Sequence, residues 1–469
     1  MSLSSNTISL RKCSKQPIEL SAQRLQSPTS SEYKMPASWQ SLSLSSAIFA
    51  ASLLVASTTI ADAGSTNMLP DNCDSGLSQH GNDTGSSGKQ GVHITQSGGD
   101  QAGSSSANPS QSNPSQDIPN QNSTSTDGSQ TQTPPALKGD CILTGDYVNN
   151  TDVTKCDSIV VDSLRVTAGV TLNLTKLQDN TKVSFKGTST FGTKLWDGPL
   201  VKLQGNNLAV TGPGTLDGQG AWYWPQGQEV DKPVFFKIYK VVNSTLSGFN
   251  LLNIPYRTFC VGNSNYTTIT GLTLNTTAGN GVAKNTDGFD LSKNDHITIT
   301  KNRIYNQDDC LAMQSSTNTV FSDNYCCGSH GISIGSLGGP KLNSSTTVDG
   351  LTVTGNTIEN STNGIRIKTI IGLKGLVTNA IYSNNKLINV TNAIVMHSDY
   401  NKTKGGYAGM PTSLVKIENI KIDGLKGTAK NLYDIVANPD VVSDWTFTNI
   451  DVVASSNGNC TGEPSSVKC

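Results

Sequence analysis

Acidic residues and one histidine recur at a fixed spacing in the middle of the chain. Asp287 and Asp308 are 21 positions apart, and Asp309 and His330 are again 21 positions apart. An interval of about 20 residues is typical of one coil of a strand-rich solenoid, and strands of neighbouring coils lie about 4.8 Å apart. We therefore expect these side chains to meet on one face, where three carboxylates and an imidazole suit acid–base hydrolysis of a bond in a sugar chain.

These residues lie in three motifs, and a cationic segment follows them. The motifs are N-T-D-G-F-D (285–290), Q-D-D-C (307–310) and C-C-G-S-H-G-I-S-I-G-S (326–336). In the later segment G-I-R-I-K, strand alternation sends the isoleucines inward and Arg366 and Lys368 outward together. Outward cations are commonly only a solvated strand face. Here they follow the histidine by one long coil, on the side where the acids gather, so we interpret them as a grip on a carboxylated sugar.

Two adjacent acids set a geometric requirement. Successive strand residues face opposite ways, so Asp308 and Asp309 both reach one cleft only if the strand bends there. The competing interpretation is a turn in which one of the two acids is structural. Tyr400 follows the next strand and would flank the same cleft.

The chain beyond residue 170 contains the elements needed to position these residues. Short β-branched runs with period two alternate with Asn or Gly. Their spacing of roughly 20 to 40 residues fits a parallel β-helix better than a β-sandwich, whose turns come every ~8–12 residues. The runs are 208–212, 246–248, 269–274, 297–302, 351–356, 381–385 and 420–424.

Two further features belong to this prediction. Asn302, Asn324, Asn356 and Asn385 recur at equivalent turns, where asparagine can adopt a left-handed backbone conformation and stack on its neighbours. A short amphipathic turn or helix at 157–164 is expected to cover the first coil, because an open solenoid end exposes a sheet edge. The predicted fold is thus an all-β, single-stranded parallel β-helix of about ten coils with a short N-terminal helix capping the first coil.

The N-terminal part of the chain has a different composition and predicts two further segments. Residues 1–63 form a leader, in which an apolar stretch (47–56) precedes the A-x-A-like cleavage site Ala61-Asp62-Ala63. Met35 is an alternative start, and a single-pass anchor is the competing interpretation, although the stretch is short of the about 20 residues that a span needs. Residues 64–138 are rich in Ser, Asn, Gln and Gly and are expected to be a disordered spacer, either a glycosylated tether or an unstructured tail. Residues 139–469 would be the catalytic β-helix.

Composition limits the possible partners and the compartment. Charged residues make up 15% of the chain and the net charge is -1, which argues against a nucleic-acid or membrane-surface partner. The ten cysteines of a secreted chain suggest disulfides. About a dozen N-x-S/T sequons agree with secretion. The local cysteine pairs would be Cys141–Cys156, Cys310–Cys326 and Cys460–Cys469, and the sequons include Asn149, Asn173, Asn243, Asn265, Asn343 and Asn401.

Together, the three motifs and the R-I-K of the cationic segment, in this order and spacing, resemble the polygalacturonases of glycoside hydrolase family 28. The segments T-F-G-T-K-L-W-D-G-P and G-T-L-D-G-Q-G-A-W-Y-W are also similar to the family's early coils, so the resemblance covers essentially residues 141–469. It departs from the family where Pro340 stands in place of a common Arg. Cys260 and Cys327 are additional to the family pattern and would pair with each other if their coils were adjacent.

The resemblance implies a right-handed parallel β-helix that hydrolyses the α-1,4 bonds of polygalacturonate (pectin) with inversion. Endo action in the extracellular space or a cell wall is expected. By position, Asp308 would be the general acid, and Asp287 and Asp309 would hold and activate the water. Further site residues would be Asn285, His330 and Tyr400, with Arg366 and Lys368 binding substrate carboxylates. No metal or cofactor is implied, and a monomer is expected.

Alternatives from other classes stay open at this level. An exo-acting polygalacturonase or a rhamnogalacturonan hydrolase would use the same motifs. A pectate lyase would be a secreted β-helix on the same polymer, but it needs acidic calcium ligands and an arginine base. A non-catalytic wall-binding β-helix would need only the solenoid, and it would not need the three aspartates.

Overall fold

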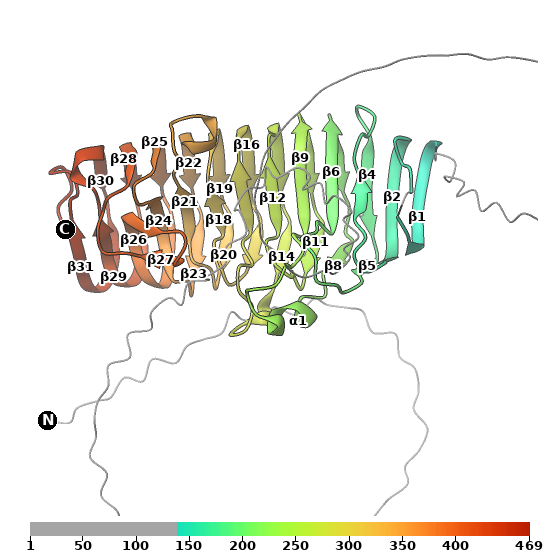
Figure 1. Ribbon diagram of the computed structural model, residues 1–469, viewed down its shortest axis with the longest axis horizontal. Helices are drawn as coiled ribbons and strands as arrows, with labels where there is room; N and C mark the ends of the chain where they lie inside the picture. The colour runs from blue at the N-terminus through green and yellow to red at the C-terminus, as the bar shows by residue number, and fades with distance from the viewer. Residues whose placement is uncertain (1–137, 150) are drawn as a thin grey trace, which may run out of the picture. The chain divides into compact units, whose positions relative to one another are not determined.

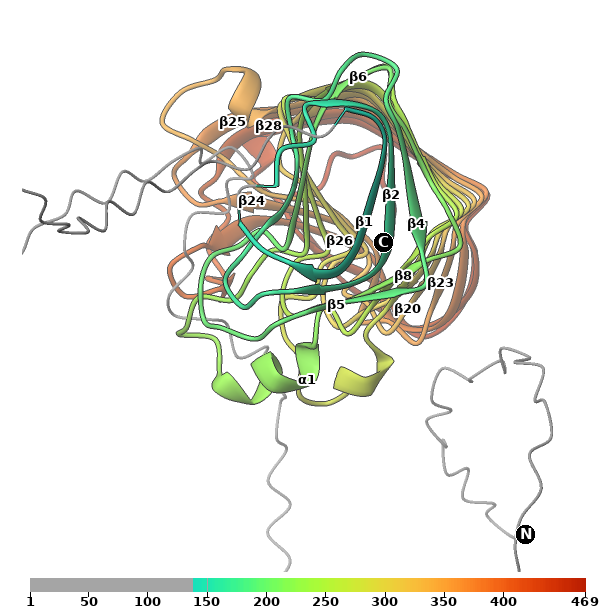
Figure 2. The same ribbon diagram turned by 90° about the vertical axis from the view of Figure 1, so that its right-hand side faces the viewer.

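The structure is a computed structural model that describes residues 138–149 and 151–469. These residues form one stack of β-coils, which Figure 1 shows from the side and Figure 2 along the stack. Hydrogen bonds join 31 strands, and the strand pairings are parallel except that of β26 with β27, which is antiparallel. The predicted parallel β-helix is therefore confirmed.

Each coil contributes strands to three columns, and the pairings run along each column. In the described residues the first column holds eleven strands, close to the expected coil number: β3 (Leu172–Leu174), β6 (Val201–Asn206), β9 (Phe236–Val242), β12 (Phe259–Gly262), β15 (Phe289–Ser292), β18 (Leu311–Met313), β21 (Ile332–Leu337), β24 (Asn363–Ile370), β26 (Lys386–Asn401), β29 (Lys426–Val436) and β31 (Asp451–Thr461).

The long strands β26, β29 and β31 begin in the third column and turn into the first, whereas β1 and β2 run from the second into the third. The second column holds β1 (Lys138–Tyr147), β2 (Lys155–Val166), β4 (Lys182–Lys186), β7 (Ala209–Thr211), β10 (Thr245–Ser247), β13 (Asn265–Thr270), β16 (Asn294–Thr300), β19 (Ser316–Ser322), β22 (Thr347–Thr354), β25 (Lys374–Ser383), β28 (Leu414–Asp423) and β30 (Val442–Thr448). The third adds β5 (Thr188–Phe191), β8 (Thr215–Asp217), β11 (Asn250–Leu252), β14 (Thr273–Asn275), β17 (Arg303–Tyr305), β20 (Tyr325–Cys327) and β23 (Thr357–Glu359).

The core consists of side chains that stack from coil to coil inside the solenoid. Alternate residues of each strand point inward, so the residue at one register position meets its counterpart one coil away. Phe236, Phe259 and Phe289 form such a row, with ring centroids 5.3 and 5.1 Å apart. Because the next residue of each strand points outward, the same register places a second row on the outer face of the first column.

The expected capping helix at 157–164 is wrong. These residues belong to β2, where Ile159, Val161 and Leu164 are buried and the strand pairs with β1 on one side and with β4 and β5 on the other. The β-branched alternation with period two overrides the weak amphipathic signal. Helical turns in the described residues are α1 (Gly220–Tyr223) and the 3-10 turns η1 (Trp224–Gln226), η2 (Thr277–Gly279), η3 (Ser344–Thr346) and η4 (Pro439–Val441).

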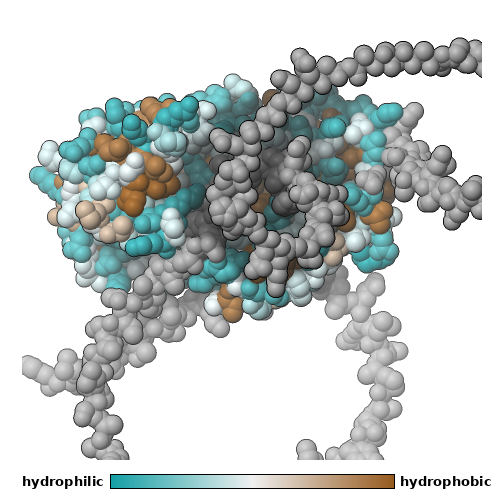
Figure 3. All heavy atoms as spheres, in the orientation of Figure 1, coloured by the Kyte–Doolittle hydropathy of each residue, from teal (hydrophilic) through white to brown (hydrophobic). Residues whose placement is uncertain are grey.

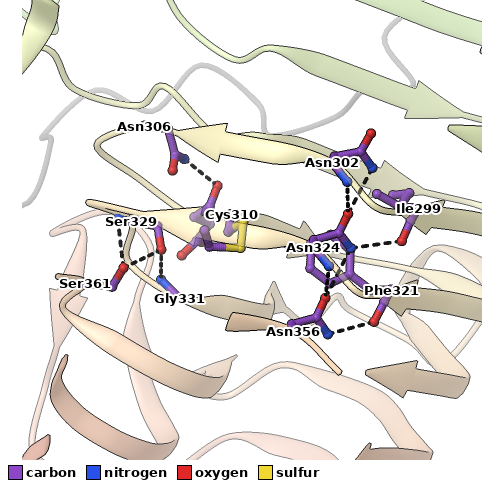
Figure 4. The surroundings of a disulfide bond; sticks show 12 residues. Ile299, Asn302, Asn306, Cys310, Phe321, Asn324, Ser329, Gly331, Asn356 and Ser361 are labelled. Atoms are coloured by element: carbon purple, nitrogen blue, oxygen red, sulfur yellow. Dashed lines mark hydrogen bonds between the residues drawn. A yellow bond between two sulfur atoms is a disulfide. The ribbon is translucent and has the colours of Figure 1, made fainter. Parts of the chain in front are cut away.

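The repeated asparagines form the predicted ladder. The side-chain amide of Asn302 donates to Asn324 Oδ1 at 3.0 Å, and that of Asn324 donates to Asn356 Oδ1 at 3.2 Å (Figure 4). The side-chain amide of Asn356 donates in turn to Asn385 Oδ1 at 3.0 Å. The left-handed conformation is found one position earlier in each turn, at Lys301, Asp323, Gly355 and Asn384, and not at the asparagines themselves. The ladder therefore acts through its buried amides.

The three local disulfides are confirmed as Cys141–Cys156, Cys310–Cys326 and Cys460–Cys469. Cys260 and Cys327 are also disulfide-bonded. They do not lie in adjacent coils, because Cys260 is on β12 of the first column and Cys327 is on β20 of the third, two coils later. The condition under which we expected them to pair with each other is not met.

The predicted leader (1–63) and most of the predicted spacer (64–138) lie outside the described residues. Within the described part, no helix has the length and apolar character needed to cross a membrane. On the face seen in Figure 3, the visible surface of the described residues is largely hydrophilic with separate hydrophobic areas.

Candidate active site

The predicted acids and histidine lie in the segments that lead into three consecutive strands of the first column. Asp287 precedes β15, Asp308 and Asp309 precede β18, and His330 precedes β21. Backbone hydrogen bonds hold these segments in register: Gly288 N–H donates to Asp309 O at 2.8 Å and His330 N–H to Asp308 O at 2.9 Å. The spacing of 21 residues therefore stacks the groups as predicted.

The chain bends at the adjacent acids, which meets the geometric requirement. Residues 306–310 lie between β17 and β18 and outside any strand. The side-chain amide of Asn306 donates to the carbonyl oxygens of both Asp308 and Asp309, each at 2.9 Å. This fixes the bend, so both carboxyl groups face the same side as Asp287.

Hydrogen bonds of two serine hydroxyl groups stabilise the turn around His330. Ser329 Oγ and Ser361 Oγ are 3.0 Å apart, and Gly331 N–H donates to Ser329 Oγ at 3.1 Å (Figure 4). Because Ser361 belongs to the next coil, the histidine is anchored to the coil that also contains the cationic segment.

Asp309 is enclosed by donors. Its carboxylate forms a close ion pair with Arg366, lies 3.2 Å from Lys368 Nζ, and accepts from Ser333 Oγ at 2.8 Å. Its side chain is 2% exposed and that of Arg366 is 6% exposed. The two cations point outward from β24 as predicted, but both are counter-ions of Asp309, with Arg366 buried and Lys368 half-buried.

Asp308 lies between an imidazole and an amide. His330 Nδ1 is 3.0 Å from its Oδ1, and Asn285 Nδ2 donates to its Oδ2 at 3.3 Å. Burial acts to raise the pKa of Asp308, but His330, Lys368 and Arg366 outweigh this effect and hold that pKa well below its ordinary value. For His330 the balance is opposite: burial lowers its pKa, yet the Asp308 carboxylate brings it above 6.5.

The pKa of Asp287 is shifted in the opposite direction from that of Asp308. Burial and the carboxylates of Asp308, Asp290 and Asp309 raise it well above 3.8, and Arg257 offsets only part of this rise. In the substrate-free site a proton therefore resides more readily on Asp287 and on His330 than on Asp308.

Two groups of side chains bring potential metal ligands together. One atom each of Asp308, Asp309 and His330 lie within 4.8 Å of one another, and the second group is Cys460, Glu463 and Cys469. Arg366 and Lys368 already neutralise Asp309, which disfavours a further cation. Cys460 and Cys469 are joined in a disulfide.

Comparison with known proteins identifies the family. The chain matches the model of glycosyl hydrolases family 28 over residues 156–469. It is 38% identical over 328 residues to the probable endopolygalacturonase E of Aspergillus niger, covering 67% of this chain and 85% of that protein. The chain belongs to glycosyl hydrolases family 28. It is also 37% identical over 345 residues to a polygalacturonase of Saccharomyces cerevisiae, covering 71% of this chain and 93% of that protein.

Solved structures agree with this family 28 fold. The chain resembles endopolygalacturonase I from Stereum purpureum, solved with two galacturonate molecules, with a TM-score of 0.52 and 25% identity over 66% of this chain and 96% of that one. An endo-xylogalacturonan hydrolase from Aspergillus tubingensis shares the fold with a TM-score of 0.59 and 24% identity, covering 66% of this chain and 90% of that one.

This family 28 site contains residues that the sequence did not single out. Ser333 occupies the register position of Arg366 one coil earlier, so the strand alternation could have identified it. Arg257 lies 3.6 Å from Asp290 beside Asp287, in a turn without any sequence signal. His397 and Tyr407 lie beside the cations, and their contacts depend on a hairpin that spacing alone does not predict.

Tyr400 flanks the cationic pair, as expected. Lys368 Nζ lies 5.3 Å from the centroid of its ring, and Tyr400 is 6% exposed. All eight predicted site residues thus occur in one region of the first column, on the segments leading into β15, β18 and β21 and on β24 and β26.

Proposed function

We propose that this chain is an endo-acting polygalacturonase that hydrolyses the α-1,4 bonds of polygalacturonate. The observation that supports this most is the stacking of three carboxyl groups and a histidine on consecutive coils beside Arg366 and Lys368. The acids suit glycoside hydrolysis, and the cations suit an anionic sugar. Relatives named as endopolygalacturonases, together with family membership, favour an endo mode on this polymer.

In this proposal Asp308 protonates the leaving glycosidic oxygen. The proton that it delivers is held on His330 in the free protein, since the pKa of His330 is raised and that of Asp308 is lowered. An arriving galacturonate carboxylate offsets the positive charge of Arg366 and Lys368, which raises the pKa of Asp308. The hydrogen bond of 3.0 Å between His330 Nδ1 and Asp308 Oδ1 offers the path for this proton.

Asp309 and Asp287 act on the water in the same proposal. Asp309 forms an ion pair with Arg366, and in this proposal its carboxylate accepts a proton from water. Inversion follows from the family mechanism, although carboxyl groups of inverting enzymes are commonly about 6.5–9.5 Å apart. In this structure a carboxylate oxygen of Asp308 and one of Asp309 lie within 4.8 Å of each other, which is closer than that range. NMR during early hydrolysis measures the product anomer directly, and inversion predicts that the β-anomer forms first.

The raised pKa of Asp287 supports one alternative assignment, in which Asp287 is the proton donor. Asp308→Asn and Asp287→Asn would be compared on polygalacturonate and on an aryl oligogalacturonide whose leaving group needs no protonation. Loss of the donor costs about 10²–10⁴-fold on the natural polymer, and much less on the aryl substrate. We expect this pattern for Asp308→Asn and a large loss on both substrates for Asp287→Asn, and the reverse pattern would assign the donor role to Asp287.

The same proposal includes the finer points of location and substrate. The disulfides and sequons of the described part support an extracellular, N-glycosylated protein. Residues 139–469 would contain the whole activity, and the polysaccharide would lie along the outer face of the first column. Treatment of the secreted chain with an N-glycosidase, followed by a mass measurement, tests the glycosylation.

A further inference from the structure

A short hairpin closes against the outer face of the first column, next to the cationic pair. The end of β26 pairs antiparallel with β27 (Gly406–Tyr407), so that Tyr400 lies opposite Tyr407 (Figure 1). Ala408 N–H donates to Asp399 O at 2.9 Å, and Gly409 N–H donates to the Asp399 carboxylate at 2.6 Å. The hairpin is therefore fixed to the strand that it covers.

A buried histidine lies beneath this hairpin. His397 Nδ1 is 2.7 Å from Asp399 Oδ1, and its Nε2 is 3.2 Å from Asp434 Oδ1. Carboxylates only accept hydrogen bonds, so both ring nitrogens must donate, and this requires an imidazolium. Burial lowers the pKa of His397, but the two carboxylates raise it to above 6.5.

Tyr407 joins this imidazolium to the catalytic cations. Its ring stacks on His397 with centroids 3.7 Å apart and an interplanar angle of 18°. Burial raises the pKa of Tyr407, and the nearby guanidinium of Arg366, the counter-ion of Asp309, acts in the opposite direction. Tyr407 is nevertheless 42% exposed, in contrast to the buried Tyr400. One ring face is thus held by the protein while part of the ring is open to solvent.

We propose that the exposed face of Tyr407 is a sugar-stacking subsite on the C-terminal side of the catalytic acids, and that His397 is the positioning residue that holds it there. Aromatic faces pack against apolar surfaces and attract positively polarised groups, which describes the C–H face of a pyranose. His397 is in register with Lys368 on the neighbouring strand, about 4.8 Å away, so the subsite would take the next sugar along the polymer. This inference rests on the proposed hydrolysis of polygalacturonate.

The charge of His397 gives the subsite a pH dependence. The charged and titratable groups that face it are Asp399 on its own strand, Asp434 on β29, Tyr407 on β27 and, in register on β24, Lys368. Because the pKa of His397 is raised, the imidazolium is fully present below pH 6.5 and is lost as the pH rises through the folded-state value. Neutral His397 can donate to only one carboxylate, so the support of Tyr407 weakens at alkaline pH.

The experiment uses end-labelled oligogalacturonides and measures which bond of each oligomer is cleaved. Tyr407→Ala is expected to raise KM for the hexamer about 10-fold, with a smaller effect on kcat, and to move cleavage away from binding modes that fill this subsite. Tyr407→Phe retains the ring and is expected to retain the wild-type pattern. His397→Gln is expected to give the pattern of Tyr407→Ala.

The chain offers a matched control pair outside the candidate active site. His296 Nδ1 is 2.7 Å from Asp295, and Tyr266 stacks on His296 with centroids 4.6 Å apart, on β13 and β16 of the second column. Tyr266→Ala and His296→Gln should leave the cleavage pattern and the KM unchanged. Tyr407→Leu fills the same space without an aromatic face and is the replacement if the alanine variant fails to fold.

The outcomes separate the claims. A merely structural role of Tyr407 would lower the Tm while the bond-cleavage pattern stayed that of the wild type, and this would overturn the subsite. An altered pattern in Tyr407→Ala with a wild-type pattern in His397→Gln would overturn the positioning role alone. If the wild-type enzyme itself cleaves no oligogalacturonide, the proposed function fails.

Discussion

Removal of the Arg366 guanidinium should lower both the free energy of unfolding and the turnover rate, because the buried Asp309 carboxylate then loses its closest counter-ion. Asp309 is 1% exposed and Arg366 is 5% exposed, and Lys368 and Ser333 remain as donors at 3.2 and 2.8 Å. Breaking a buried ion pair costs about 3–5 kcal/mol, and the remaining donors place Arg366→Met near the lower end, at about 3 kcal/mol. Lys368→Met leaves the closer pair intact and should cost about 1.5 kcal/mol.

The assay is urea unfolding, combined with initial rates on polygalacturonate. Asp309→Asn in the Arg366→Met background should recover part of the lost stability, with a coupling of about 2 kcal/mol in the double-mutant cycle. Arg165→Met is the matched control, since Arg165 and Asp146 form a pair at 2.7 Å on the exposed surface, and it should change neither quantity measurably. Unfolding of Arg366→Met at the wild-type urea midpoint would refute the reasoning.

Three further predictions follow from the same contacts. His330→Gln should move the alkaline limb of the pH–rate profile toward acid. The raised pKa of His330 keeps the catalytic proton bound above pH 6.5, and in the variant only Asp308, whose pKa is lowered, can hold it. An alkaline limb at the wild-type pH would show that another group titrates there. Asn324→Ala should lower the free energy of unfolding by about 1–3 kcal/mol, since it leaves Asn302 and Asn356 without their ladder partner in the core. Asn457→Ala, at an exposed asparagine of β31, should be nearly neutral. A chain that begins at residue 138 should hydrolyse soluble polygalacturonate with the kcat/KM of the full chain, and failure to do so would contradict the assignment of the activity to the solenoid.

The arrangement of the site could be predicted from the sequence because a solenoid converts sequence spacing into distance. Once the interval between Asp287 and Asp308 equals one coil, the register places both groups on the same face. The sequence showed that the chain must bend at Asp308 and Asp309 if both are to reach one site, but it did not show how the bend forms. The bend depends on the side-chain amide of Asn306, which donates to the carbonyl oxygens of both residues.

Other parts of the structure could not be predicted, and the reasons are physical. The segment 157–164 contains both a weak helical and a strong strand pattern, and pairing with strands on two sides decides for the strand. The contacts of Arg366 and Lys368 with Asp309 join residues that are 57 and 59 positions apart in sequence. The contact between Tyr407 and His397 arises from an irregular hairpin, whose geometry has no periodic signal in the sequence.

The most direct test of the central claim is the time course of products from unesterified polygalacturonate. We expect a fast fall in viscosity, new reducing ends, and oligomers of many sizes before monomer appears. No absorbance from an unsaturated sugar is expected. The Asp308→Asn variant should release almost none of these products while remaining folded. Monomer as the first product, unsaturated products that a chelator abolishes, or binding without new reducing ends would each contradict the account.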